Sequence, residues 1–195
     1  FDERLTRFKF EFVLIDEATQ SLELESMATL LNGARQLVLV GDQKQLGPTV
    51  IESELQEIGY NIPLYERLLK NDHPFIMLDE QYRMHPEIAQ ISNSRFYGGM
   101  IRSRVTVPER TDWQFSSIWI KPEVPIIFCE VFEFEELSVT SYLNRFEYVA
   151  IEKFIRRFKD LGLPASDIGV ITFYEGQVLE CKRRLDKLSE EVDPY

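Results

Sequence analysis

The stretch FVLIDEATQ, residues 12–20, decides how this chain can fold and where its chemistry can lie. Its apolar residues 13–15 run directly into two carboxylates, Asp16 and Glu17. A short, continuous apolar run that ends in polar residues is typical of a buried strand in a parallel sheet. In open α/β sheets, ligands bind at the carboxyl ends of such strands. The stretch therefore predicts an α/β fold with an acidic pair at a ligand-binding edge.

Strand-like and helix-like segments alternate along the rest of the chain. Apolar runs predict further strands, and apolar residues at helical spacing predict helices. This alternation is typical of parallel sheets flanked by helices, and a boundary near residues 79–82 divides the chain into two incomplete α/β units. The predicted strands are residues 36–40, 75–78, 124–131 and 168–172, and the predicted helices are residues 21–31, 63–71, 86–97, 144–161 and 175–188.

The composition is that of a folded, acidic protein. The 195 residues are 44% hydrophobic and 12% aromatic, which is enough apolar material for a core. The net charge of −11 gives no general attraction for nucleic acid, although a local basic groove stays open as an alternative. No apolar run approaches the roughly 18 residues of a membrane helix, and the charged N-terminal sequence is unlike a signal peptide. We expect a soluble, intracellular protein.

Cysteine and histidine give no sign of a metal centre. Cys129 and Cys181 lie far apart in apolar or amphipathic runs, which predicts two buried or half-buried free thiols. His73 and His85 also lack the spacing of zinc ligands. Any metal in this protein is therefore expected to use oxygen ligands.

The acidic pair suits metal-assisted chemistry on a phosphate. Adjacent residues at a strand end point in different directions, so Asp16 can reach a metal ion while Glu17 addresses a water molecule. Mg²⁺ needs only one carboxylate when substrate phosphates and waters supply its other ligands. The alternative is structural: Asp16 caps the following helix and Glu17 is simply solvated.

A second polar loop follows the next predicted strand. The sequence VLVGDQKQLGP, residues 38–48, places Gln45 after Gly41 and Asp42. An uncharged glutamine can both donate to and accept from a terminal phosphate or its attacking water. An ordinary Gly-Asp turn is the alternative.

The third motif is DEQYRMHP, residues 79–86, just before a predicted helix. Tyr82 can stack on a nucleotide base, and Arg83 can stabilise the charge that builds up during phosphoryl transfer. The alternative is a structural tyrosine beside an arginine in a surface salt bridge.

Taken in order, these motifs resemble motifs II, III and IV of superfamily 1 helicases. The matching stretches are IDEATQ (15–20), VGDQKQLGP (40–48) and QYRMHPEIAQISNSRFYGG (81–99). Two later stretches, TSYLNRFE (140–147) and IGVITFYEGQ (168–177), resemble the second motor domain of RNA helicases of the nonsense-mediated mRNA decay type. The resemblance covers nearly the whole chain and implies two RecA-like P-loop NTPase domains, with ATP and Mg²⁺ as cofactors.

The resemblance implies a role for each motif residue. Asp16 would hold Mg²⁺, Glu17 would polarise the attacking water, and Gln45 would contact the γ-phosphate. Tyr82 would lie against the base or ribose, and Arg83 would reach the phosphates.

One further residue, Thr172, would lie near the nucleic-acid backbone at a strand-to-helix turn. Phe173 follows Thr172 at the position where the family usually has proline, so the chain departs from the family pattern at this turn.

The chain lacks the sequence of a P-loop, because none of its nine glycines precedes a lysine. The order of motifs in the family places the P-loop before Phe1 and the last motifs after Tyr195. We therefore expect the back half of a first RecA-like domain at residues 1–80 and the front half of a second at residues 81–195. Such a chain alone is expected not to turn over ATP.

Two alternatives to an RNA helicase motor stay open. The chain can belong to a catalytically dead, truncated paralogue that acts as a binding module. It can also belong to a related superfamily 1 helicase that acts on DNA, since these motifs do not separate the two nucleic acids. In the main interpretation, the intact protein translocates on single-stranded RNA in the cytoplasm, binds decay-factor proteins through other regions and has no membrane partner.

Overall fold

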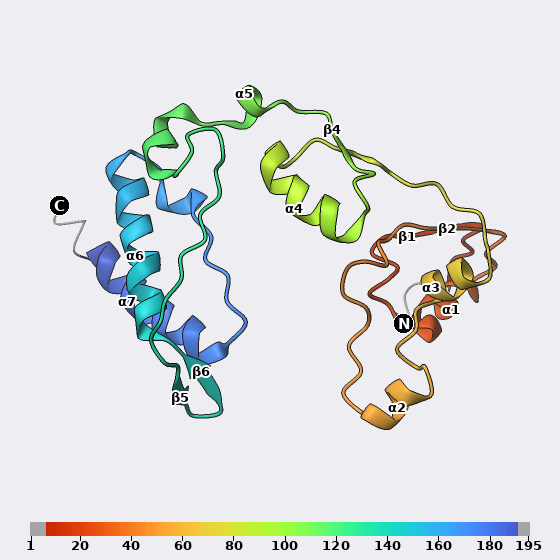
Figure 1. Cartoon of the computed structure of the whole chain (residues 1–195). Helices are drawn as coiled ribbons and strands as arrows, with labels where there is room; N and C mark the ends of the chain where they lie inside the picture. Colours follow the sequence, from red (N-terminus) through yellow and green to blue (C-terminus); the bar gives the residue numbers. More distant parts are fainter. Residues whose placement is uncertain (1–6, 191–195) are drawn as a thin grey trace. The chain divides into compact units, whose positions relative to one another are not determined.

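The computed structural model describes residues 7–190, and their side chains as far as residue 185. The chain divides into two compact units, and the boundary falls between Leu78 and Asp79. Both units mix short strands with helices, so the predicted α/β class is present in its coarse form (Figure 1). Each unit is held together by its own internal contacts.

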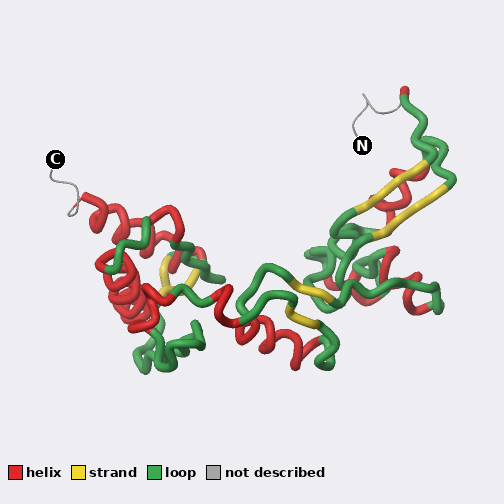
Figure 2. Tube along the Cα trace, turned by 90° about the horizontal axis from the view of Figure 1, so that it is seen from above, coloured by secondary structure: helices red, strands yellow, loops and turns green. Residues whose placement is uncertain are grey.

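In unit 1, β1 (Phe12–Ile15) and β2 (Gln36–Leu39) form a parallel pair, as the sequence predicts. Figure 2 shows the two strands side by side. In their register, Phe12 lies opposite Gln36, and Ile15 lies opposite Leu39. Strand β1 is only half-buried, because Phe12 and Leu14 are 55% and 57% exposed, whereas the alternate residues Val13 and Ile15 are partly buried. The expected fully buried strand is therefore wrong for β1, since one face has no described element packed on it.

Helices α1 (Glu23–Leu30) and α3 (Leu64–Lys70) pack together and α1 contacts β1, while a short helix α2 (Ser53–Glu57) lies between them in sequence. The Arg67 guanidinium joins α3 to α1 through two hydrogen bonds to the Glu23 carboxylate, at 2.8 and 2.6 Å. This contact lowers the pKa of Glu23, chiefly through the hydrogen bond from Arg67. Bidentate geometry makes such a pair stronger than most surface ion pairs.

Unit 2 begins with a parallel pair that the sequence does not predict, β3 (Glu80–Gln81) with β4 (Arg102–Ser103). Between them lies α4 (Pro86–Phe96), which begins at Pro86 as expected. The buried His85 ring caps α4, because its Nδ1 accepts from the Glu87 amide at 3.2 Å. Its Nε2 lies 3.2 Å from the Thr111 hydroxyl, beyond the short helix α5 (Val107–Arg110).

The rest of unit 2 contains a hairpin, two long helices and two short 3-10 helices, Trp113–Ile118 and Ala165–Asp167. Strands β5 (Glu136–Ser138) and β6 (Ser141–Leu143) are antiparallel, and α7 (Glu175–Glu190) packs against β6 and α6 (Arg145–Asp160). Tyr148 of α6 is completely buried, and the Arg184 guanidinium lies 5.0 Å from the centre of its ring. The long helices begin within one residue of their predicted starts.

Three predicted strands do not form in the described residues. Segments 75–78, 124–131 and 168–172 contain no ladder pairing beyond a single bridge between Lys121 and Val124. A strand is stable only beside another strand that accepts its backbone hydrogen bonds, and the described chain provides none at these segments. Their apolar side chains are consequently exposed, as Ile76 at 91% and Ile171 at 92% illustrate.

The described cysteines and helices bear on two further expectations. Cys181 of α7 is buried, whereas Cys129 is exposed because its segment does not form the predicted strand. Within residues 7–190, no helix combines the length and the apolar character that crossing a bilayer requires.

Candidate functional site

The acidic pair lies directly after β1, on a tight turn. The Asp16 Oδ1 atom accepts a hydrogen bond from the Glu17 amide at 2.9 Å, and both side chains are exposed. Glu17 has a φ of 51°, in the left-handed region where a residue with a Cβ is strained. Asp16 does not cap the following helix, since α1 starts at Glu23 and the Leu22 amide instead donates to Glu25 at 2.8 Å.

The loop after β2 is held against this turn. The Ala18 amide donates to the Val40 carbonyl at 2.8 Å, and the Val40 amide donates to the Ile15 carbonyl at 2.8 Å. Gly41 then approaches Thr19 so closely that a Cβ at position 41 would lie 3.1 Å from the Thr19 nitrogen. The first two motifs are thus neighbours at the carboxyl edge of the β1–β2 pair.

The Gln45 side chain is presented by a turn around Asp42. The Asp42 carboxylate accepts from the Lys44 amide at 3.0 Å and from the Gln45 Nε2 at 2.9 Å. Gln45 itself is exposed, so its amide can exchange the Asp42 contact for a ligand. The loop has the geometry of an ordinary turn that begins at an aspartate. This geometry agrees with a structural turn and also with a glutamine that contacts a phosphate.

Sequence reasoning missed Tyr65 of α3 as a neighbour of this loop. Burial raises the pKa of Tyr65, and the negative charge of Asp42 raises it further. The tyrosine therefore lies within electrostatic reach of the second motif. Nothing in the local sequence signals this relation, because α3 is separated from β2 by a long irregular segment and by α2.

The carboxylates of unit 1 do not form a closed metal cage. Among the described residues, no three side chains of His, Cys, Asp or Glu gather where they can hold one ion. The Asp16 side chain is nevertheless exposed at the strand end. One carboxylate of this kind fits Mg²⁺ that takes its remaining ligands from phosphates and water.

The third motif forms a loop at the end of β3. The Tyr82 hydroxyl donates to Glu80 Oε2 at 2.7 Å, and the Tyr82 ring is 59% exposed. Arg104 also binds the Glu80 carboxylate. The Arg104 hydrogen bond, followed by the Tyr82 hydrogen bond, lowers the pKa of Glu80 to about 2.

Arg83 projects from this loop into solvent. Its guanidinium makes no hydrogen bond or ion pair within the part of the chain that the structure describes. The alternative of a surface salt bridge is therefore not realised there. By contrast, Arg102 forms ion pairs with Asp79 at 2.9 Å and with Glu80 at 3.4 Å.

Thr172 lies just before α7, on a turn of its own. Its hydroxyl accepts from the Tyr174 amide at 3.4 Å, and Phe173 between them is 98% exposed. The start of α7 approaches the hairpin so closely that a Cβ at Gly176 would lie 2.7 Å from the Tyr142 carbonyl oxygen. This contact requires glycine at position 176.

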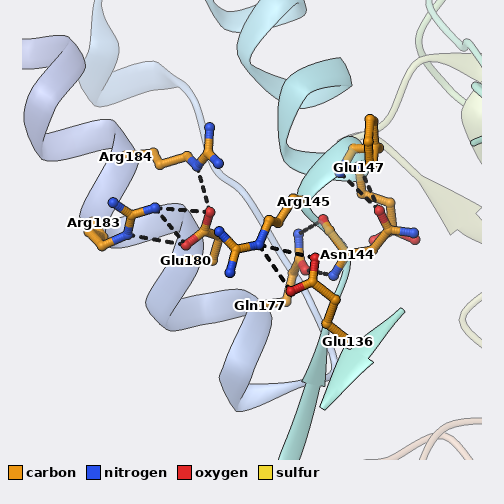
Figure 3. A network of polar contacts seen from close by, with 9 residues as sticks. Glu136, Asn144, Arg145, Glu147, Gln177, Glu180, Arg183 and Arg184 are labelled. Atoms are coloured by element: carbon orange, nitrogen blue, oxygen red, sulfur yellow. Dashed lines mark hydrogen bonds and ion pairs between the residues drawn. The ribbon is translucent and has the colours of Figure 1, made fainter. Parts of the chain in front are cut away.

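A buried polar network fixes the start of α7 relative to the start of α6 (Figure 3). The Gln177 side-chain oxygen Oε1 accepts a hydrogen bond from the Asn144 backbone N–H at 2.6 Å, and its Nε2 donates to the Asn144 backbone carbonyl at 3.1 Å. The Asn144 side chain in turn caps α6 through the Phe146 and Glu147 amides, at 2.9 and 3.2 Å. Further along α7, Glu180 binds Arg183 and Arg184.

A hollow in the described residues lies elsewhere in unit 2. It has a volume of about 590 Å³ and lies along α6, where Phe146, Val149, Ala150 and Phe154 provide apolar walls. The candidate site residues Asp16, Glu17, Gln45, Tyr82, Arg83 and Thr172 do not line it. The predicted site residues lie in three places. Asp16, Glu17 and Gln45 lie on adjoining loops of unit 1. In unit 2, Tyr82 and Arg83 lie on one loop and Thr172 lies on another turn.

The chain is similar in sequence to known helicases and regulators of nonsense transcripts. A regulator of nonsense transcripts 1 homolog from Neurospora crassa is 46% identical to this chain over 178 residues, and one from Arabidopsis thaliana is 42% identical. The ATP-dependent helicase upf1 of Schizosaccharomyces pombe is 40% identical. Each similarity covers 90% of this chain but only 16, 14 and 19% of the respective relative.

These relatives confirm the resemblance that the motifs carry. Sequence profiles of AAA domains match residues 2–53 and residues 60–193, and these two ranges together contain all of the motif residues. The second profile alone matches more than half of the chain. The chain therefore belongs to the AAA domain family.

Proposed function

We propose that this chain is the middle of an ATP-dependent RNA helicase motor of the nonsense-mediated mRNA decay type. The observation that carries the proposal is the meeting of two motifs at the carboxyl edge of β1 and β2, where Gly41 packs on Thr19. A ligand-binding edge of this kind is typical of parallel α/β sheets. The names of relatives such as the ATP-dependent helicase upf1 support nucleotide use.

Residues 1–80 would form the back half of a first RecA-like domain, and residues 81–195 the front half of a second. The boundary between the compact units at Leu78 and Asp79 supports this division. The two motif groups would then belong to different domains.

In unit 1, each motif residue has a distinct task. Asp16 would hold Mg²⁺, which supplies charge neutralisation for the phosphates when it is bound. Glu17 would polarise the attacking water and accept a proton from it. Because Asp16 and Glu17 are adjacent, their side chains point in different directions. Gln45 would contact the γ-phosphate by releasing its hydrogen bond to Asp42, which holds it at 2.9 Å.

In unit 2, Tyr82 would stack on the base or ribose and Arg83 would reach the phosphates. The free guanidinium of Arg83 supports this role, because an arginine already paired with a carboxylate would have to give up that partner first. Thr172 would contact the backbone of a single-stranded nucleic acid. Its turn lies at the start of α7, where helix amides favour phosphate.

The decisive experiment compares ATP hydrolysis by a longer protein that carries this chain with hydrolysis by its Glu17→Gln variant. We expect RNA-stimulated turnover in the parent and its loss, by at least 10²-fold, in the variant, as befits removal of a general base. Undiminished turnover in Glu17→Gln would contradict the role of Glu17. The 195-residue chain alone is expected to show no turnover, because it has no Gly-rich loop followed by lysine.

The same assay separates the remaining candidates. RNA and DNA oligomers of equal length should stimulate hydrolysis unequally, with RNA the stronger, and equal stimulation would argue against RNA specificity. A longer protein that binds RNA but never hydrolyses ATP would support the dead paralogue. A cytoplasmic site of action and binding of decay-factor proteins are part of the proposal and are tested by localisation and co-purification.

A further inference from the structure

The Gln81 side chain is the centre of the loop that carries Arg83. Its Oε1 atom accepts from the Arg83 amide at 3.1 Å and from the Met84 amide at 2.8 Å. Its Nε2 atom donates to the Met84 carbonyl at 3.0 Å and to the Ser103 hydroxyl at 2.7 Å. Both donors and both acceptor positions of this amide are therefore used.

The orientation of the Gln81 amide follows from its neighbours. Two backbone N–H groups can only face an oxygen, and the Met84 carbonyl can only face a nitrogen. If Oε1 and Nε2 were exchanged, the side-chain NH₂ group would face the two backbone N–H groups, and the side-chain oxygen would face the Met84 carbonyl oxygen. The side chain thus has a single satisfactory arrangement, and it fixes two consecutive amides of the loop.

No other described side chain holds these two amides. The flanking carbonyls have separate partners, since the Arg104 amide donates to the Gln81 carbonyl at 2.9 Å and Arg110 donates to the Tyr82 carbonyl at 2.5 Å. These contacts anchor the start of the loop. The segment from Arg83 to Met84 depends on the Gln81 side chain.

We propose that Gln81 is the positioning residue for Arg83 and sets the direction in which the guanidinium leaves the loop. This inference rests on the proposed role of Arg83 toward the phosphates of a nucleotide. Because the Arg83 guanidinium has no partner among the described residues, no side-chain contact restricts its direction. The backbone of the loop then sets the direction of the Arg83 Cα–Cβ bond, and with it the region that the guanidinium can reach. A backbone held before the ligand arrives loses less entropy in the transition state.

The first test measures backbone order in the 195-residue chain, independently of any activity. In Gln81→Met, which keeps the length of the side chain but cannot form these hydrogen bonds, the Arg83 and Met84 amides should exchange with deuterium at least roughly fivefold faster. Gln81→Glu keeps the acceptor oxygens and should retain more of the protection. Gln90→Met, on the exposed face of α4, is the matched control. Equal exchange in Gln81→Met and the parent would overturn the proposal.

The second test uses the longer protein and its ATP hydrolysis. Gln81→Met should lower kcat about tenfold with little change in the KM for ATP, and the loss should nearly disappear when Arg83 is already alanine. Additive losses in the double variant would show that Gln81 acts on something other than Arg83 and would overturn the proposal. If Arg83→Ala alone leaves hydrolysis unchanged while the exchange effect of Gln81→Met persists, the proposed role of Arg83 fails, and the positioning role falls with it.

Discussion

Gly41 lies so close to Thr19 that a Cβ at position 41 would make an unusually tight contact. A Cβ on Gly41 would lie 3.1 Å from both the nitrogen and the Cγ2 atom of Thr19, and 3.3 Å from the Ala18 nitrogen. Two of these three atoms belong to the backbone, which cannot rotate away. Thr19 is itself only 2% exposed. Together with the backbone hydrogen bonds from Ala18 to Val40 and from Val40 to Ile15, the contact keeps the loop with Asp42 beside the turn with Asp16.

Substituting Gly41 with alanine should separate the two loops. We expect Gly41→Ala to lower the free energy of unfolding of unit 1 by about 1–3 kcal/mol, because a methyl group is forced into a filled space. Gly47→Ala is the matched control, since its nearest atom would lie 4.0 Å away. Urea denaturation of both variants measures the difference. Equal stabilities would show that the loops adjust without cost.

The backbone strain at Glu17 predicts an unusual ranking of substitutions. With a φ of 51°, Glu17 should be replaced more favourably by glycine than by alanine, and we expect Glu17→Gly to be more stable than Glu17→Ala by about 1 kcal/mol. The reverse order should hold at Glu54 on α2, where alanine favours the helix by a similar amount. Urea denaturation of the four variants tests both signs. A preference for alanine at position 17 would contradict the strained conformation.

The ionisation of Glu80 should depend on Arg104 more than on Arg102. The hydrogen bond from Arg104 is the largest cause of the Glu80 pKa near 2, whereas Arg102 contributes only through its charge. Arg104→Ala should therefore raise the Glu80 pKa toward its ordinary value of 4.5, and Arg102→Ala should raise it less. Carbon-detected NMR titration of the Glu80 carboxyl group measures both shifts. Equal shifts would mean that charge alone, without the hydrogen bond, sets the pKa.

The same pair implies a direction for the pH dependence of stability. Because the folded state lowers the Glu80 pKa, the ionised carboxylate stabilises unit 2 above a pH of about 4.5, and this contribution disappears as the pH falls toward 2. In Glu80→Gln, thermal unfolding should respond less to pH across this interval than in the parent chain. A Glu80→Gln profile parallel to that of the parent would contradict the linkage.

Gln177 should be essential for holding α7 against the start of α6. Its removal leaves the buried Asn144 amide without its 2.6 Å acceptor, and an unsatisfied buried amide costs about 1–3 kcal/mol. We expect Gln177→Ala to lower the free energy of unfolding of unit 2 by this amount. Lys182→Ala, on an exposed position of the same helix, should change it by less than about 0.5 kcal/mol. Guanidinium denaturation followed by far-UV circular dichroism compares the two.

The main helices follow from local sequence. Pro86 starts α4, Asn144 caps α6, and a glycine, Gly162, follows the end of α6, so each signal acts within one turn of the chain. The parallel pairing of β1 with β2 was also predictable, because two apolar runs separated by a helix have few other arrangements. The three missing strands show the limit of this reasoning. An apolar run such as residues 168–172 has the composition of a strand, but pairing needs a partner that no local pattern supplies.

The sequence alone determined the identity and order of the motif residues, and with them the family, because both depend only on which side chains occur at which spacing. The tertiary structure decided how those residues are held. It revealed the Thr19–Gly41 contact, the strained backbone of Glu17 and the hydrogen bond from Tyr82 to Glu80. It also revealed the hydrogen bonds of the Gln81 side chain to the Arg83 and Met84 amides. Each of these joins atoms through the packing of separate segments or through backbone torsion angles, and neither is encoded by residue spacing along the chain.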